Sequence, residues 1–354
     1  MKSNLLKKFL SFSIGGYVNI LIGLVAIPIT TRMILPEQYG IFSLINVLIQ
    51  IFVILCLLGM EQGFVRFFYD EDETAKGKLL FNSISIPLGV WLFLSFILYI
   101  LREKIAIFVV GKNDDFLWKI LSLGTFLTVL RTFSFLVIRM QQKGKLYSFF
   151  NILLKLSEFL FIFAFFSFFG NSYKTLAYSF VLSLVLTVVV SIIEERKIWS
   201  FSGKSIIEKK ELIIYSLPLS LTMALTWIFA SSDKIMIKIF SNLKELGYYA
   251  GAFKIILVLS VIQGGFTTFW TPVMYEHYQK KPEDKYFFKK TNEYLSLTFF
   301  ILGTGVLMIR NLSLIILGKN YYEAIYIIPM LVFVPVMYLI SETTMMGIVF
   351  KKKS

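Results

Sequence analysis

Residues 41–62 read IFSLINVLIQIFVILCLLGMEQ, and no charged residue precedes Glu61 in this stretch. An α-helix needs about 20 mainly apolar residues to cross about 30 Å of hydrocarbon. The stretch meets this requirement, so it predicts one transmembrane helix. The sequence on both sides repeats the pattern.

Nine further segments qualify in the same way. They cover residues 10–34, 79–101, 117–138, 147–169, 173–193, 212–232, 247–273, 292–310 and 324–348. The first is too long for the apolar part of a signal peptide and lacks an Ala-x-Ala cleavage site, so we interpret it as a retained span. All connections are short, which leaves no room for a soluble catalytic domain. The expected fold is an all-α integral membrane protein with about ten transmembrane helices.

The composition supports this prediction. The 354 residues are 57% hydrophobic and only 16% charged, and the mean hydropathy is +0.74. Two soluble domains of this size would need a more polar surface. Cys56 is the single cysteine and His277 the single histidine, which excludes an intrachain disulfide, a Cys/His zinc cluster and a Cys-His catalytic pair. We therefore expect no metal and no cofactor.

The positive charges predict the orientation of the chain, because short basic loops stay in the cytoplasm. Of the 36 Lys and Arg residues, 22 lie at the N-terminus and in the connections after the second, fourth, sixth, eighth and tenth segments. The opposite loops hold 11, and three lie inside segments. Both termini are therefore expected in the cytoplasm. The net charge of +14 then reflects membrane topology, and no nucleic-acid partner is expected.

The sequence also contains an internal repeat with an offset of about 207 residues. The matching landmarks are Gly40 with Gly247, Gly111-Lys112-Asn113 with Gly318-Lys319-Asn320, and, at offset 208, Val65-Arg66-Phe67 with Val273-Met274-Tyr275. Six segments separate the two copies, so both copies run in the same direction, as in known transporters with parallel repeats.

The repeat predicts two helical lobes. They are a six-helix lobe over residues 1–197, a cytoplasmic linker over 198–211 and a four-helix lobe over 212–354. The second lobe has no counterpart of residues 147–193. We therefore expect a fold of six plus four helices that lacks the last two helices of a twelve-helix plan. Either the second lobe is naturally short, or the chain is a truncated form of a twelve-helix protein.

Four stretches resemble a known family when they are taken in this order and on this pattern of segments. They are residues 31–40 (TRMILPEQYG), 66–71 (RFFYDE), 232–235 (SDKI) and 246–249 (LGYY). They are similar to the oligosaccharide flippases of polysaccharide biosynthesis, in the multidrug, oligosaccharidyl-lipid and polysaccharide exporter superfamily. The resemblance implies two helix bundles around a central cavity that opens alternately to each side of a bacterial cytoplasmic membrane. It also implies transport of undecaprenyl-diphosphate-linked O-antigen or capsule repeat units, without catalysis.

Charged residues inside the predicted spans are the candidate site residues, because a charge at mid-bilayer costs about 2.5–3.5 kcal/mol on insertion scales. Arg131, Lys155 and Lys254 are the basic ones. We expect Arg131 and Lys155 to bind the diphosphate from the cytoplasmic side, and Lys254 to hold it once the cavity opens outward. Arg66 is a further candidate, although its place near a span end also suits a side chain that reaches the lipid headgroups.

The acidic candidates are Glu61, Glu158, Asp233 and Glu342, which could couple transport to protons or cations or could form ion pairs. Lys155 and Glu158 are three residues apart and share a helix face, so an internal pair is one interpretation. Asp233 could pair with the adjacent Lys234 at the outer end of its span. Prolines kink helices, and Pro28 and Pro218, in the first helix of each half, are the candidate hinges.

Several alternatives remain open from the sequence. The chain could export another substrate of the same superfamily, or it could be a membrane-embedded glycan polymerase or acyltransferase. A polymerase would be expected to carry a sizeable external loop, and an acyltransferase a base at the membrane, whereas the only histidine lies in a cytoplasmic loop. The expected partners are the lipid-linked oligosaccharide, membrane lipids and polysaccharide polymerase machinery.

Overall fold

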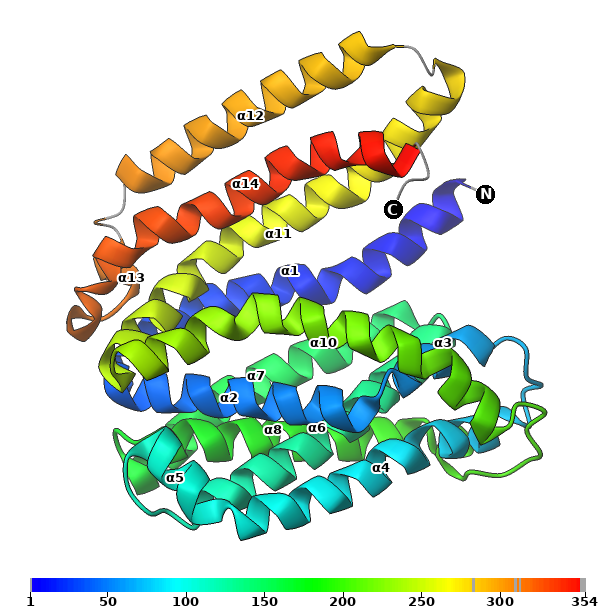
Figure 1. Ribbon diagram of the computed structural model, residues 1–354, viewed down its shortest axis with the longest axis horizontal. Coiled ribbons are helices and arrows are strands. Elements are labelled where there is room, and N and C mark those ends of the chain that lie inside the picture. The colour runs from blue at the N-terminus through cyan, green and yellow to red at the C-terminus, as the bar shows by residue number, and fades with distance from the viewer. Residues whose placement is uncertain (1, 282–283, 309–310, 312, 351–354) are drawn as a thin grey trace. The chain divides into compact units, whose positions relative to one another are not determined.

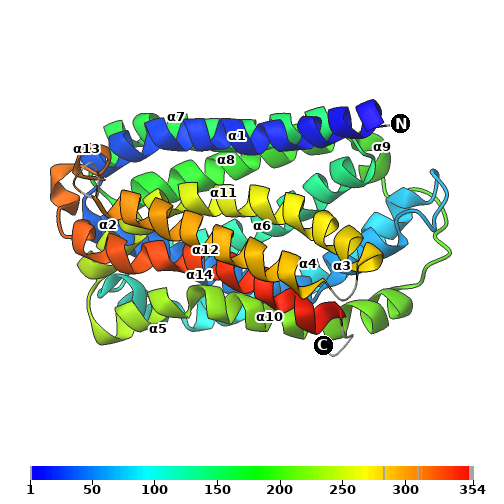
Figure 2. The same cartoon turned by 90° about the horizontal axis from the view of Figure 1, so that it is seen from above.

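The computed structural model describes residues 2–281, 284–308, 311 and 313–350, and they are helical apart from short connections. Ten long helices cover the ten predicted spans: α1 (Lys2–Met33), α2 (Pro36–Leu57), α4 (Lys76–Ile100), α6 (Phe116–Met140), α7 (Gly144–Phe169), α8 (Tyr173–Glu194), α10 (Lys209–Phe240), α11 (Leu243–Lys280), α12 (Lys285–Met308) and α14 (Ala324–Phe350). Residues 309 and 310, at the end of the predicted ninth span, lie outside the described residues. The course of the helices is shown in Figures 1 and 2.

Eight helices in the described part of the chain are long and apolar enough to cross a membrane. They are α1, α2, α4, α6, α7, α8, α10 and α14. The chain is therefore a multi-pass membrane protein with an all-α fold. Five shorter elements were not predicted: α3 (Met60–Phe67), α5 (Arg102–Val110), α9 (Arg196–Trp199), α13 (Ser313–Ile316) and the 3₁₀ helix η2 (Lys319–Tyr321).

The helix boundaries reproduce the internal repeat. Helix α1 covers residues 2–33 and α10 covers 209–240, so both ends differ by 207 residues. Helices α2 and α11 begin at residues 36 and 243, again 207 apart. The short helices α5 and α13 each precede one copy of the Gly-Lys-Asn sequence. The copies differ at one point, because α2 is interrupted at Leu58 and Gly59 before α3, whereas α11 is one continuous helix.

The chain forms two compact units. The first contains Met1–Ala26 and Glu37–Leu246, and the second contains Ile27–Pro36 and Gly247–Ser354. The units thus divide the chain differently from the lobes predicted from the repeat, since α10 belongs to the first unit and the end of α1 to the second. The lobes 1–197 and 212–354 stay a prediction.

In the first unit, α8 packs against α6 and α7. The contact is built on a row of small polar residues spaced four apart, all fully buried: Thr175, Ser179, Ser183, Thr187 and Ser191. Each hydroxyl donates a hydrogen bond to a backbone carbonyl three to five residues earlier in the chain. Small side chains let helices approach closely in a membrane, where the lipid is as apolar as the protein interior.

In the second unit, α12 packs along α14, as Figure 1 shows in orange and red. The end of α1 is held there by hydrogen bonds to the segment before α14. The Gly318 amide donates to Thr31 Oγ1 at 3.1 Å, and the Tyr321 hydroxyl donates to the Ile34 carbonyl at 3.0 Å. The start of α11 lies so close to the chain at Pro36 that only glycine fits at position 247.

Candidate functional site

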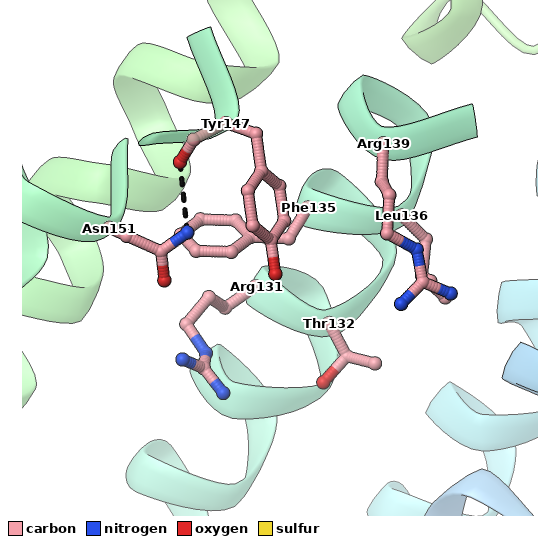
Figure 3. A pocket seen from close by; sticks show the side chains of 7 residues that line it. All are labelled: Arg131, Thr132, Phe135, Leu136, Arg139, Tyr147 and Asn151. Carbon is pink, nitrogen blue, oxygen red and sulfur yellow. Dashed lines mark hydrogen bonds between the residues drawn. The ribbon is translucent and has the colours of Figure 1, made fainter. Parts of the chain in front are cut away.

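A pocket of about 200 Å³ lies between α6 and α7 in the first unit. It is lined by Arg131, Thr132, Phe135, Leu136 and Arg139 of α6 and by Tyr147 and Asn151 of α7 (Figure 3). The two helices are consecutive and joined by the short connection 141–143. By the predicted orientation, this connection and the pocket beside it face the cytoplasm.

The α6 side of the pocket supplies two positive charges. Arg131 and Arg139 are eight residues apart, about two helical turns, and both reach the same pocket. Arg131 is half-buried and Arg139 is exposed. The Arg131 guanidinium carbon lies 5.4 Å from the centre of the Phe135 ring, in a cation–π contact. A cation–π contact holds the guanidinium near the ring without using its N–H donors.

The Arg131 side chain has a hydrogen-bond donor that no other described residue uses. Its Nε is buried and has no hydrogen-bond partner within the described ranges. No ion pair joins Arg131 or Arg139 to an acidic residue in that part of the structure. Two guanidinium groups that lack acidic partners in one pocket are suited to a ligand with several anionic oxygens, because arginine binds phosphate through paired N–H donors.

The α7 side adds neutral polar groups. Asn151 Nδ2 donates to the Tyr147 carbonyl at 2.9 Å, one turn earlier in the same helix. The Tyr147 ring meets the Phe135 ring edge to face, with the centroids 5.8 Å apart. Figure 3 shows the Tyr147 hydroxyl pointing toward the side of the pocket where Arg131 and Thr132 lie. The pocket therefore combines two cations, a phenol and an amide over an aromatic floor.

Lys155 lies about one turn beyond Asn151 on α7 and does not line this pocket. Its Nζ is 2.9 Å from Glu158 Oε2, so the two residues form the ion pair that their spacing predicts. Arg66, the fourth basic candidate, pairs with Asp70 at 2.9 Å, and both side chains are about half exposed. The structure thus separates Arg131 from the other basic candidates of the first unit. Lys254 is half-buried on α11 in the second unit.

The acidic candidates lie in different environments. Glu61 and Glu342 are both buried, with 5% of each exposed, and Glu158 is held by Lys155. Asp233 Oδ1 accepts a hydrogen bond from the backbone N–H of Lys234 at 2.8 Å. Neither carboxylate oxygen of Glu61 has a hydrogen bond of good geometry within the described residues.

Both candidate hinge prolines lie inside long helices. Pro28 is inside α1, two residues after the boundary at which the chain passes from the first compact unit to the second. Arg32 donates to the Pro28 carbonyl at 2.7 Å and to the Ile315 carbonyl at 2.7 Å. Pro218 is inside α10, two residues after Ser216, which packs against the interruption between α2 and α3.

Sequence reasoning missed two buried acids at the predicted cytoplasmic ends of the helices. Glu71 accepts hydrogen bonds from the Ser205 hydroxyl and from the amides of Ile206 and Ile207, so it anchors the connection before α10. Glu195 accepts from Gln141 and pairs with Lys143, so it anchors the loop between α6 and α7. Both lie in hydrophilic stretches, where a buried carboxylate cannot be distinguished from a solvated one.

Arg139, Tyr147 and Asn151 were also missed as pocket residues. Arg139 was interpreted only as a topology signal, because basic residues are expected at cytoplasmic span ends. The available signal was the spacing of Arg131 and Arg139, which places them about two turns apart on one helix.

Comparisons with known proteins agree with this architecture. Residues 5–278 match the model of the family described as polysaccharide biosynthesis protein. A search of curated proteins found no match. Among solved structures, the chain is similar to a lipid II flippase, MurJ, in an inward closed conformation, with a TM-score of 0.69 and 17% identity over 94% of this chain and 74% of that one.

A second similar structure is an inward-facing multidrug resistance MATE family transporter of the MOP superfamily. The TM-score is 0.64 and the identity 13%, over 92% of this chain and 80% of that one. At such identities the two likenesses concern the fold alone. The match to the family model covers most of the chain and carries the assignment: this chain belongs to the polysaccharide biosynthesis protein family.

Proposed function

We propose that this protein moves undecaprenyl-diphosphate-linked oligosaccharide repeat units outward across the bacterial cytoplasmic membrane by alternating access, with both termini in the cytoplasm and without chemical change to the substrate. The family supports a role in polysaccharide biosynthesis. The fold it shares with a lipid II flippase and a MATE transporter supports transport.

The observation that carries the proposal is the pocket with Arg131 and Arg139. A diphosphate offers several anionic oxygens, and two guanidinium groups with free donors match it. The pocket lies at the end of α6 that is predicted to face the cytoplasm, where lipid-linked repeat units would be loaded. Its volume of about 200 Å³ suits a diphosphate and leaves the glycan and the lipid outside it.

Binding measurements on purified protein in lipid nanodiscs test the pocket. We expect Arg131→Ala to weaken binding of undecaprenyl diphosphate by about 10- to 100-fold, the range expected when a hydrogen bond to a charged group worth about 1.5–3 kcal/mol is removed. Arg131→Lys keeps the charge but loses the paired donors, so its loss should be smaller. Arg102→Ala is the matched control, because Arg102 pairs with Asp115 near the other end of α6.

Undiminished binding in Arg131→Ala, Arg139→Ala and the double variant would contradict the assignment of the pocket. Equal affinity of the wild-type protein for undecaprenyl monophosphate and diphosphate would also argue against it, since a second phosphate adds the oxygens that two arginines can use.

A cellular experiment separates the flippase from the enzyme alternatives. Deletion of a flippase leaves lipid-linked repeat units in the cytoplasmic leaflet, whereas deletion of a polymerase leaves single units already exported, and loss of an acyltransferase leaves the amount of surface glycan intact. We expect the first pattern. Loss of drug resistance with unchanged surface glycan would instead support an exporter of another substrate.

A further inference from the structure

The interruption between α2 and α3 is a strained bending point in the first half of the chain. Leu58 has φ 47° and Gly59 has φ 74°, both in the left-handed region. A non-glycine residue pays about 1–2 kcal/mol to adopt that conformation, so Leu58 is held there by its surroundings. At the equivalent place in the repeat, α11 continues as an unbroken helix.

Glu61 begins the first turn after this interruption and lies on the apolar face of α3. It shares that face with Phe64 and Phe68, three and seven residues later, which are both fully buried. The Phe64 ring lies 5.4 Å from the Phe68 ring and 6.0 Å from the Phe133 ring of α6. Glu61 itself is only 5% exposed. The repeat has Thr268 at offset 207, so the carboxyl group belongs to the interrupted copy alone.

The Glu61 carboxyl has weak polar support. Its own backbone N–H and the Gln62 side chain are turned toward it, but neither reaches hydrogen-bond geometry. An ionised carboxylate in an apolar place without hydrogen bonds costs several kcal/mol. Such a group either takes up a proton or moves to water.

No charged group offers Glu61 an ion pair in the part of the chain that the structure describes. Helix α3 packs against α4, α6 and α10, and the charges on these elements are engaged elsewhere or exposed. Arg66 pairs with Asp70. Lys76, which is buried, pairs with Glu73 and lies over the Phe68 ring, 4.5 Å from its centre. Lys78 and Lys209 lie over Phe81, and Arg131 lies over Phe135. Lys210, Glu211 and Arg139 are exposed, and Lys119, Asp233, Lys234 and Lys238 lie toward the opposite ends of α6 and α10.

We propose that Glu61 is a proton-binding site that controls the packing of α3. With the proton bound, the neutral carboxyl stays on the apolar face and α3 remains packed against α6 and α10. Loss of the proton to water creates a charge that this environment does not stabilise, and α3 swings about Leu58 and Gly59 to hydrate it. The inference concerns the protein without substrate, so it stands or falls separately from the proposed transport activity.

The single cysteine of the chain reports on this motion. Cys56 is fully buried and lies two residues before Leu58, so opening of the interruption should expose it to N-ethylmaleimide. Its alkylation can be measured in purified, substrate-free protein at about pH 6 and about pH 8. Comparison of variants at one pH cancels the effect of pH on the thiol itself.

At about pH 8 we expect Cys56 to react about tenfold faster in the wild-type protein than in Glu61→Gln, which mimics the protonated form; a tenfold ratio corresponds to about 1.4 kcal/mol of opening free energy. At about pH 6 the two rates should converge. Glu103→Gln, which changes an exposed acid beside Arg102, should behave as wild type at both values. Equal rates in wild type and Glu61→Gln at both pH values would overturn the proposal.

Two further measurements keep the test decisive. The first is the ratio of the hydrogen-exchange rate of residues 58–67 to that of α6 in the wild-type protein, which should rise between about pH 6 and about pH 8. A constant ratio would overturn the proposal. This measurement does not depend on whether Glu61→Gln folds. Protection of Cys56 at about pH 8 by sodium chloride but not by choline chloride would identify a metal-cation site in place of a proton site, and so would also overturn it.

Discussion

The hydroxyl oxygen of Ser216 on α10 lies 2.5 Å from the position that a β-carbon on Gly63 of α3 would occupy. A β-carbon on Gly59 would lie 2.4 Å from the backbone carbonyl oxygen of the same serine. Two glycines one turn apart therefore allow α3 to approach α10 this closely. The contact lies beside Pro218, so the interrupted helix and the proline-containing helix meet at the same level.

Substitution of Gly63 should destabilise this contact in a way that Ser216 can relieve. Gly63→Ala places a methyl group against the Ser216 hydroxyl and should cost about 1–3 kcal/mol, the usual range for overpacking. Ser216→Ala alone should be neutral or slightly stabilising, because Ser216 Oγ is buried and has no hydrogen-bond partner among the described residues. Thermal unfolding of the purified protein in detergent measures both effects.

The double variant Gly63→Ala/Ser216→Ala should recover most of the loss in melting temperature, which makes the pair a double-mutant cycle. Gly59→Ala should not be rescued by Ser216→Ala, because its clash is with backbone and its φ of 74° disfavours alanine. Equal rescue of both glycine variants would contradict this packing of Gly59 and Gly63 against Ser216.

The ion pair between Lys155 and Glu158 gives a second prediction. Lys155→Ala leaves the Glu158 carboxylate without its charged donor on a membrane helix, and should lower stability by about 2 kcal/mol. Lys155→Ala/Glu158→Ala should be more stable than Lys155→Ala, since no isolated charge remains, and the exchanged pair Lys155→Glu/Glu158→Lys should approach wild type. The melting temperature is again the measurement. A double variant less stable than both single variants would mean that Lys155 and Glu158 act independently.

The sequence predicted the long helices well because each contains a long, mainly apolar run, and the run itself is the signal. The interruption at Leu58 and Gly59 lies inside such a run, with apolar residues on both sides, so hydropathy could not reveal it. The repeat contained a partial signal, because Gly59, which has φ 74°, has Phe266 as its counterpart in the continuous helix α11.

Only part of the candidate site could be predicted from the sequence. Arg131 was identified because a charge within an apolar run is rare and costly. Arg139, Tyr147 and Asn151 lie at helix ends, where polar residues are common, and their shared pocket depends on how α6 and α7 pack. The sequence also grouped Lys155 with Arg131, but helix packing places Lys155 outside the pocket and pairs it with Glu158.

The buried carboxylate of Glu71 gives a third prediction, on the connection between α9 and α10. Its three hydrogen bonds to Ser205, Ile206 and Ile207 fasten this connection to the one between α3 and α4. Glu71→Ala should release it, and cleavage by trypsin after the exposed Lys204 should accelerate by about tenfold or more, as expected if about 1.4 kcal/mol or more of local stability is lost. Glu71→Gln keeps one acceptor oxygen, so its rate of trypsin cleavage should lie between the rates of the wild-type protein and Glu71→Ala.

The neighbouring Asp72 provides a matched control for this experiment, since its side chain is exposed. Asp72→Asn removes one negative charge from the same loop without touching the three hydrogen bonds. Trypsin cleavage at Lys204 in Asp72→Asn should therefore match wild type. Equal acceleration in both variants would attribute the effect to loop charge instead of the Glu71 contacts.

Asp114, in the connection between α5 and α6, gives a pH-dependent prediction. Burial alone would raise the pKa of its carboxyl, but hydrogen bonds from the Tyr173 hydroxyl at 2.6 Å and the Phe116 amide at 3.0 Å, together with Lys174 at 3.3 Å, outweigh it and lower the pKa below its ordinary value. A lowered pKa in the folded state means that Asp114 stabilises the protein above the unfolded-state pKa of about 3.9. That stabilisation is lost as the pH falls through the lower folded-state value.

The melting temperature of the wild-type protein should therefore begin to fall at about pH 4 because of Asp114, and this contribution should grow at lower pH. Asp114→Asn should lower the melting temperature at neutral pH and should lose this contribution, because the amide cannot accept the same hydrogen bonds as a carboxylate and does not titrate. Asp115→Asn is the control, since Asp115 is exposed and lies 3.6 Å from Arg102. Stabilisation of the protein by Asp114→Asn at neutral pH would contradict this prediction. It would mean that burial destabilises the carboxylate more than Tyr173, Phe116 and Lys174 stabilise it, so that its pKa would be raised and not lowered.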